Sequence, residues 1–92
     1  MRKNLPQSVA KYAESPLFNE HTVPDKLTSN HDLKPGVWGR ICVMSGTLDY
    51  NVSGDPPRAY SIKGGQHVII EPGQLHFVTP TGKVEFKVEF YR

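Results

Sequence analysis

The stretch from residue 37 to residue 52, VWGRICVMSGTLDYNV, alternates between apolar and polar side chains on both sides of a central Ser45-Gly46 pair. Successive side chains of a β-strand point to opposite faces, so this alternation predicts two strands with one buried face each. If Ser45-Gly46 forms a two-residue turn, Met44 faces Thr47 and the apolar residues of both strands fall on one side. The stretch therefore predicts a β-hairpin at the centre of the chain. Its apolar side comprises Val37, Ile41, Val43, Leu48, Tyr50 and Val52, and its other side comprises Trp38, Arg40, Cys42, Met44, Thr47, Asp49 and Asn51.

The rest of the chain also favours β-structure. It contains 8 Gly and 8 Pro, shows no sustained helical period, and gathers β-branched and aromatic residues into short runs. Glycines at positions 46, 54, 64, 73 and 82 mark evenly spaced turns, which is typical of a sandwich or barrel. We expect an all-β, antiparallel sandwich or barrel with essentially no helix, in a single domain spanning residues 1–92. Strands are expected at residues 8–14, 17–18, 59–62, 66–70, 75–79 and 84–91, and residues 19–33 are interpreted as a loop with at most a short strand at 26–29.

A second alternating pattern lies in the C-terminal half. With residues 71–74 and Thr81-Gly82 as turns, three strands place their large apolar side chains on one face, which must be covered. Burial of each such side chain contributes roughly 1.5–3 kcal/mol. In this register His76 lies opposite Lys87 and diagonal to Glu89. The apolar face comprises Val68, Ile70, Leu75, Phe77, Val84, Phe86, Val88 and Phe90, and the opposite face comprises His67, Ile69, His76, Val78, Glu85, Lys87, Glu89 and Tyr91.

Charge and cysteine content exclude several classes of protein. The net charge is +2 and acidic and basic residues are interspersed, so no basic stripe favours a nucleic-acid partner. The single cysteine, Cys42, excludes an internal disulfide and a CxxC metal site. The chain shows no signal peptide and no long apolar run, so we expect a cytoplasmic protein that does not bind membranes.

Motifs in the chain resemble those of a known family. The stretch from Gly64 to His76, with a Pro-Gly turn followed by a His, is similar to the second motif of cupins, which are small double-stranded β-helix barrels. The ligand positions of the first cupin motif are instead occupied by residues such as Lys34, Pro35, Gly36 and Gly39. Four ordered motifs, LPxxVxxYxxSPxF, PGVWGRIxVxxGxLxY after His31, IxPxxxH and FxVEFYR, resemble the TehB/YeaR-like domain family.

This resemblance implies a cupin-like double-stranded β-helix that stands alone and is associated with tellurite or related chemical stress. Some members precede a methyltransferase, but this chain carries no Gly-rich nucleotide loop after a strand, so methyl transfer is not carried over.

Three residues form a candidate metal site. His76 occupies the cupin motif position, His31 lies just upstream of the missing first-motif ligands, and Glu89 shares a face with His76 in the predicted register. Imidazole and carboxylate ligands suit Zn, Fe, Ni or Mn. In the alternative interpretation, His76 binds a backbone group, Glu89 pairs with Lys87 or Arg92, and His31 is a loop residue. Cupin ligands point into the barrel, so either His76 lies at the barrel mouth or a bulge near Pro72-Gly73 changes the register.

Two further features lie on the polar side of the central stretch. Cys42 has no resolving cysteine, and its expected neighbour Asp49 raises the thiol pKa, so an inert thiol is favoured over a redox role. Trp38 and Arg40 either line a pocket for an oxyanion or simply pack against each other.

Two functions follow from these features. The first is a binding or sensing module for a small molecule, oxyanion or metal. The second is a small cupin metalloenzyme of the dioxygenase or isomerase kind. In both cases we expect a homodimer that pairs through edge strands.

Overall fold

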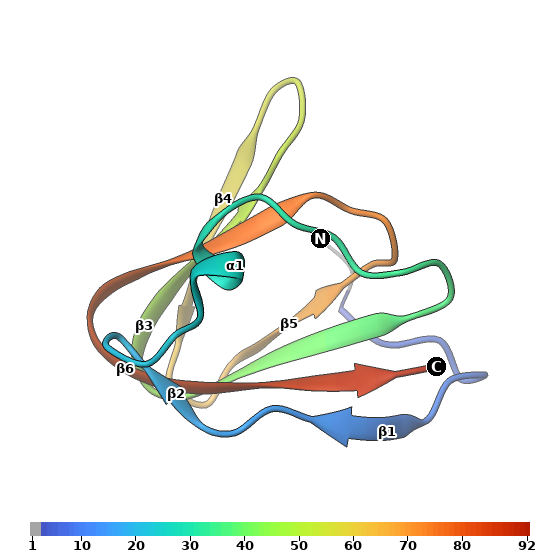
Figure 1. Cartoon of the computed structure of the whole chain (residues 1–92), viewed down its shortest axis with the longest axis horizontal. Coiled ribbons are helices and arrows are strands. Elements are labelled where there is room, and N and C mark those ends of the chain that lie inside the picture. Colours follow the sequence, from blue (N-terminus) through green and yellow to red (C-terminus); the bar gives the residue numbers. More distant parts are fainter. Residues whose placement is uncertain (1–2) are drawn as a thin grey trace.

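A six-stranded antiparallel sheet forms nearly the whole fold in the computed structural model, which describes residues 3–92 (Figure 1). The strand order is β1-β6-β3-β4, with β2 beside β6 and β5 beside β3. This arrangement confirms the predicted all-β, antiparallel class. The elements are β1 (Lys11–Glu14), β2 (Phe18–Asn19), α1 (Asp25–Thr28), β3 (Trp38–Val52), β4 (Arg58–Lys63), β5 (His67–Ile70) and β6 (His76–Tyr91).

The central stretch is one continuous strand, so the predicted hairpin at Ser45-Gly46 is wrong. β3 pairs with β6 along its whole length, from Trp38 opposite Tyr91 to Val52 opposite His76. The register shifts on both sides of Ser45-Gly46, as in β-bulges, and a bulge bends a strand and changes the phase of its alternation. The alternation of buried and exposed side chains therefore shifts by one residue at Ser45-Gly46, as it would at a two-residue turn. The predicted apolar residues Ile41, Val43, Leu48 and Tyr50 are buried for this reason, although no hairpin forms.

Gly46 explains why a residue typical of turns lies inside a strand. Its φ is +76°, and a Cβ at this position would overlap the carbonyl oxygen of Lys83 on β6. Only glycine allows both this backbone conformation and this close approach without strain. β3 and β6 can therefore bend together at this point.

The predicted turn at Thr81-Gly82 is also wrong, because β6 continues through it. The expected pairing of residues 66–70 with residues 75–79 does not form either, since β5 pairs with β3. The side chains of residues 75–79 consequently point to the faces opposite to those predicted. His76 and Val78 are buried, and Leu75 is 48% exposed. A shift of one residue moves every side chain of a strand to the opposite face.

The N-terminal strands extend the sheet alongside β6. β1 and β2 both pair with β6, which confirms the short strands expected there. The strand expected at residues 26–29 is replaced by the single helical turn α1. Pro24 precedes the turn in an extended conformation and Asp25 lies in its first turn, where a carboxylate favours helix formation. Among the described residues, no helix is long and apolar enough to cross a membrane.

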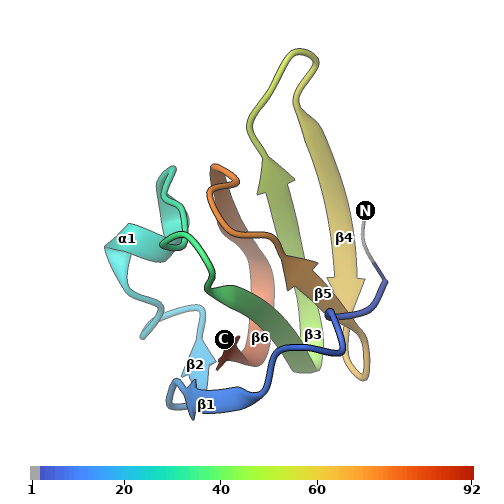
Figure 2. The same ribbon diagram turned by 90° about the vertical axis from the view of Figure 1, so that its right-hand side faces the viewer.

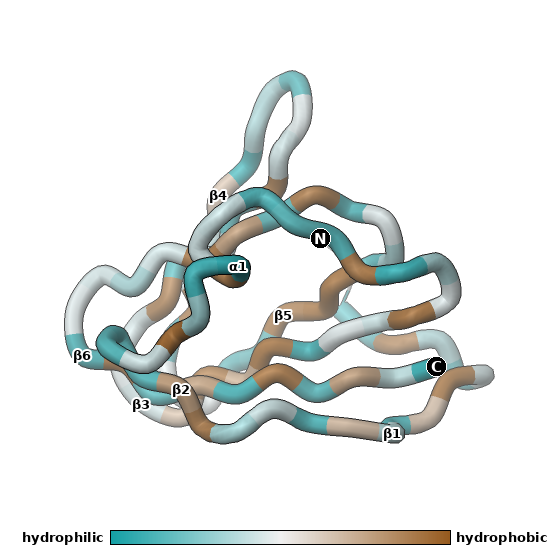
Figure 3. Tube along the Cα trace, viewed as in Figure 1, coloured by the Kyte–Doolittle hydropathy of each residue, from teal (hydrophilic) through white to brown (hydrophobic). Residues whose placement is uncertain are grey.

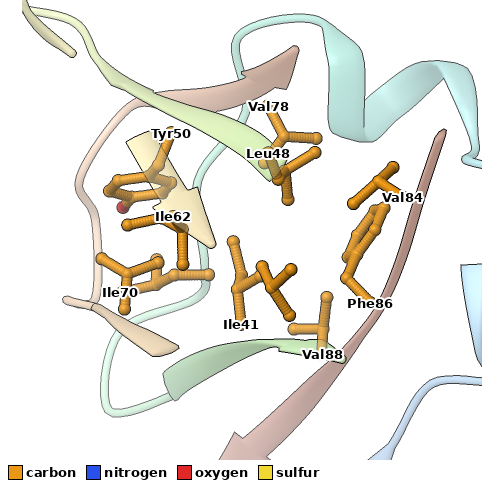
Figure 4. Packing of buried hydrophobic residues seen from close by; sticks show 11 residues of the cluster. Ile41, Leu48, Tyr50, Ile62, Ile70, Val78, Val84, Phe86 and Val88 are labelled. Atoms are coloured by element: carbon orange, nitrogen blue, oxygen red, sulfur yellow. The ribbon is translucent and has the colours of Figure 1, made fainter. Parts of the chain in front are cut away.

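The core lies inside the bend of the sheet. Residues from both halves of β3, such as Ile41 and Leu48, belong to the same buried cluster (Figure 4). Hydrophobic residues recur along β3, β5 and β6, whereas the chain around α1 is largely hydrophilic (Figure 3). The β3–β4 hairpin projects from the body of the molecule (Figure 2). β1 and β4 end the strand order, and the homodimer expected through edge strands stays a prediction.

Residues 20–37, called the crossing segment here, return the chain from β2 to β3. Val23, Leu27 and Leu33 of this segment pack against the core. The amide of Gly73 donates a hydrogen bond to the carbonyl oxygen of Leu33 (3.0 Å), which fixes the far end of the segment to the β5–β6 loop. The crossing segment therefore forms one wall of the barrel.

Candidate ligand pocket at a histidine pair

A cavity of about 190 Å³ lies between the crossing segment and the inner face of the sheet. Its walls are mostly apolar, and two histidines, one lysine and one aspartate supply its polar groups. We call it the histidine pocket. From the crossing segment it is lined by Lys26, Leu27, His31, Asp32 and Leu33, and from the sheet by Ile41, Ile70, His76, Val78, Phe86, Val88 and Phe90.

His31 and His76 are held together by both backbone and side chain. The amide of His31 donates to the carbonyl of His76 (3.0 Å), and the amide of His76 donates to the carbonyl of His31 (2.9 Å). This exchange is an antiparallel bridge, which places the two side chains on the same side. The ring centroids lie 4.2 Å apart, and His76 is only 1% exposed. The two imidazoles predicted from the sequence therefore converge.

Hydrogen bonds to backbone carbonyls fix the tautomer of both rings. His31 Nδ1 lies 3.1 Å from the carbonyl oxygen of Ser29, and His76 Nδ1 lies 2.7 Å from that of Gln74. A carbonyl oxygen only accepts, so in each ring Nδ1 carries the proton. In the neutral ring Nε2 is then left with its lone pair. The pair can accept hydrogen bonds or bind a metal through Nε2.

Burial keeps His76 neutral. Loss of solvation lowers the pKa of His76, and the neighbouring His31 lowers it further, against an opposing effect of the Gln74 carbonyl and Asp32. The Tyr50 ring lies 5.6 Å from the His76 ring and is 1% exposed. Burial also raises the pKa of Tyr50, so its hydroxyl stays protonated. The residues that line the pocket from the sheet therefore add no ionised group beside His76 at neutral pH, and the charged side chains of the lining, Lys26 and Asp32, come from the crossing segment.

Glu89, the third predicted metal ligand, lies elsewhere. Its Oε1 binds the Arg40 guanidinium at 2.7 and 2.8 Å and accepts from the Tyr91 hydroxyl at 3.0 Å. Its Oε2 lies 3.2 Å from Lys11 Nζ and 3.5 Å from Lys87 Nζ. We call this group on the outer face of β6 the Glu89 cluster. Its members are Lys11, Arg40, Lys87, Glu89 and Tyr91.

The ionised state of Glu89 is stabilised strongly. Burial by itself raises the pKa of Glu89, but the hydrogen bonds from Arg40, Lys11 and Tyr91 outweigh this effect and lower the pKa to about 2. The structure thus brings two of the three predicted ligands together and places the third in an ion-pair network. Among residues 3–92, no three His, Cys, Asp or Glu side chains are grouped in a way that would hold a metal ion.

The residues predicted to bind an oxyanion belong to the outer face. The Arg40 guanidinium is engaged by Glu89, and it also lies 5.7 Å from the centre of the Tyr91 ring. Trp38 is half-buried at the start of β3, where its backbone pairs with Tyr91. Neither side chain lines the histidine pocket.

Cys42 also lies on the outer face, and it pairs across the sheet with His67 and Lys87 rather than facing Asp49. Burial raises the pKa of the Cys42 thiol, as does the nearby Glu89, whose Oε1 lies 3.6 Å from Sγ. The predicted direction of the pKa shift is confirmed, with Glu89 as the responsible carboxylate.

The sequence did not single out the pocket residues of the crossing segment other than His31. Leu27, Asp32 and Leu33 line the pocket from a region that was interpreted as a loop. One available signal was the Pro24-Asp25 pair, which is typical of a helix start and would have placed Leu27 on a short helix.

Comparisons with known proteins agree with the fold. The family model described as the TehB-like domain matches residues 13–88. An uncharacterized protein YeaR from Escherichia coli K12 is 26% identical over 95% of this chain and 81% of its own length.

Three solved structures resemble the chain. An Escherichia coli K12 protein superposes with a TM-score of 0.89 at 24% identity over 99% of this chain and 97% of that chain. TehB from Haemophilus influenzae gives 0.85 at 21% identity, and the match covers 92% of this chain but only 32% of TehB. A cupin-2 domain protein from Shewanella frigidimarina gives 0.60 at 16% identity over 95% and 82%. The expected cupin-like fold is thereby confirmed.

Proposed function

The chain belongs to the TehB-like domain family, and on this basis we propose that it is a binding and sensing module that holds a small molecule in the histidine pocket. The observation that carries the proposal is the convergence of His31 and His76 on a mostly apolar cavity, with Nδ1 of each ring fixed to a carbonyl. The proposal includes the association with tellurite or related chemical stress that the sequence resemblance implies.

The pocket favours one kind of ligand. Leucine, isoleucine, valine and phenylalanine side chains form most of its wall, and such surfaces bind apolar groups. In its neutral form an imidazole with Nδ1 protonated offers a lone pair on Nε2, so the matching ligand group is a hydrogen-bond donor. An anion would meet these lone pairs, and among the lining residues only the Lys26 ammonium could donate to it. We therefore place a small, largely apolar molecule with one N–H or O–H group in the pocket, rather than an oxyanion beside Arg40, whose guanidinium already binds Glu89.

Phenol is a suitable probe of this proposal, because it combines an apolar ring with one O–H donor. We expect phenol to shift the backbone resonances of His76, Val78 and Phe86 in NMR spectra, and benzoate to shift them less. His76→Phe keeps the volume of the side chain but removes both ring nitrogens, so it should abolish the preference for phenol over benzoate. His21→Phe is the matched control, because His21 is exposed outside the pocket.

A second variant separates pocket binding from a folding defect. Leu27→Trp fills the cavity from the crossing segment while both histidines stay, and it should weaken phenol binding. The proposal is wrong if phenol shifts no pocket resonance, or if both variants bind phenol like the wild type while thermal melts show that they are folded.

The alternative is a metalloenzyme with Zn, Fe, Ni or Mn at the histidine pair. The hydrogen bonds from Nδ1 to carbonyls favour it, because metal-binding imidazoles are usually oriented in this way. The described residues provide no third ligand, however, so a cupin centre of three or four protein ligands does not fit. Stoichiometric metal in chelator-free protein that disappears in His76→Ala would support this alternative over the binding module.

A further inference from the structure

A second set of potential ligands lies on the outer face of β3 and β5, away from the histidine pocket. Cys42 on β3 is directly opposite His67 on β5 in the strand register. Met44 lies two residues further along β3, at the register shift between Val43 and Ser45, and it lines the same cavity as Cys42. A cavity of about 320 Å³ is lined by Arg40, Cys42, Val43, Met44, Gly65, Gln66 and His67, and it shares no residue with the histidine pocket.

The side chains of this cavity form a soft ligand set. Cys42 offers a thiolate, Met44 a thioether and His67 an imidazole, and directly opposed residues of antiparallel strands have Cβ atoms about 4.5–5.5 Å apart. Sulfur ligands of this kind select Cu(I) over the harder divalent ions. We propose that Cys42, Met44 and His67 bind one Cu(I) ion at this face of the protein.

The other charged groups near the cavity are consistent with a monovalent, sulfur-bound ion. Among the lining residues of the described part of the chain there is no aspartate or glutamate, so this wall offers no carboxylate ligands for Mg²⁺ or Ca²⁺. Glu89 lies 3.6 Å from Cys42 Sγ, but it is bound by Arg40, Lys11 and Lys87.

Binding is an exchange of a proton for the metal. The S–H bond of Cys42 breaks, an S–Cu bond forms, and the proton passes to solvent, while copper stays Cu(I) throughout. A bound metal deprotonates its thiol ligand outright. The positive charges of Arg40 and Lys87 favour the thiolate electrostatically. Because a proton is released, the apparent affinity should rise with pH over the range in which the free thiol stays protonated.

Access to the site needs no opening of the barrel. Cys42 is half-buried, His67 is exposed and Met44 is 55% exposed. Met44 lines the same cavity as a thiol and an imidazole. The site is thus able to exchange metal with a small carrier molecule or another protein.

Titration of the purified full chain with Cu(I), in competition with bicinchoninate and without oxygen, tests this inference. We expect one Cu(I) per chain, and an affinity that falls by at least about tenfold in Met44→Leu and in His67→Gln, and by more in Cys42→Ser. X-ray absorption of the complex should show two sulfur atoms and one imidazole nitrogen around copper. The control variant His21→Gln should bind Cu(I) like the wild type, because His21 is exposed and does not line the cavity.

A bare thiol would also bind Cu(I), so the methionine and histidine variants decide the outcome. If Met44→Leu and His67→Gln bind as tightly as the wild type, Cys42 acts alone and the site is refuted. The same conclusion follows if the absorption spectrum shows a single sulfur ligand. Both positions are exposed, so their variants are expected to fold, and circular dichroism checks this.

Discussion

The histidine pocket and the Glu89 cluster both use β3 and β6, yet they hold buried titratable groups in opposite charge states. His76 faces the inside of the bend among apolar side chains, and burial favours its neutral form. Glu89 faces outward, and three cations and a tyrosine hydroxyl favour its ionised form. Solvent is largely absent from both residues, which are 1% and 5% exposed. The charge state is therefore decided by the partners within hydrogen-bonding distance and not by burial alone.

The comparison also shows why the two residues do not share a site. Side chains alternate along β6, and Phe86, Val88 and Phe90 line the pocket. Glu89 lies between two of these positions and points to the opposite face. A change of phase within β6 would have been needed to bring Glu89 to the side of His76, but His76, Phe86 and Val88 are buried in one phase of alternation.

The largest expected effect is that of Glu89→Gln. This change leaves Arg40, Lys11 and Lys87 without their common partner, and we expect it to lower the free energy of unfolding by about 3 kcal/mol at neutral pH. Urea unfolding monitored by tryptophan fluorescence measures this loss. Glu85→Gln is the matched control, because Glu85 is exposed and only approaches Ser45 Oγ at 3.4 Å; it should change stability by less than about 0.5 kcal/mol. A loss of similar size in both variants would contradict the special role of the cluster.

A smaller loss of stability should appear on mild acidification, and it should arise from His76 in the histidine pocket. The pKa of His76 is lower in the folded chain than its ordinary value of 6.5, so the unfolded chain binds the proton more readily. Stability should therefore begin to fall as the pH drops below about 6.5. Glu89 contributes its stability above pH 4.5 and loses it between about 4.5 and 2, which is a separate window.

Single substitutions show which residue causes each loss of stability on acidification. His76→Gln should remove the loss that begins near pH 6.5 and keep the one below pH 4.5, whereas Glu89→Gln should do the reverse. Denaturant midpoints across this pH range measure both. If Glu89→Gln removed the loss near pH 6.5, the two regions would be coupled and the contrast drawn between them would fail.

Side-chain alternation made much of the fold predictable. The buried residues Ile41, Val43, Leu48 and Tyr50 follow from period-two patterning, whatever joins the two halves. The structure that connects the two halves at Ser45-Gly46 was not predictable in the same way. Ser45-Gly46 is equally compatible with a turn and with a bulge, and what distinguishes them is the close approach of Lys83 on a strand far away in sequence.

The site was predictable only in part. The motif position of His76 and the location of His31 were sufficient to identify the pair, because both lie at points that the barrel brings together. Glu89 was assigned to it through a register that depended on a turn at Thr81-Gly82. Lys87, a partner expected for Glu89 in the alternative interpretation, does pair with it. Lys11 and Arg40, however, come from β1 and β3, and no local pattern reveals such long-range ion pairs.

The most direct test of the account concerns the two imidazoles. NMR measurement of the ring nitrogen shifts at neutral pH reports which nitrogen carries the proton. We predict that in both His31 and His76 Nδ1 is protonated and Nε2 is not, with through-space contacts between the two rings. A proton on Nε2 of either ring, or rings without mutual contact, would contradict the proposal that this pair presents two lone pairs to a ligand.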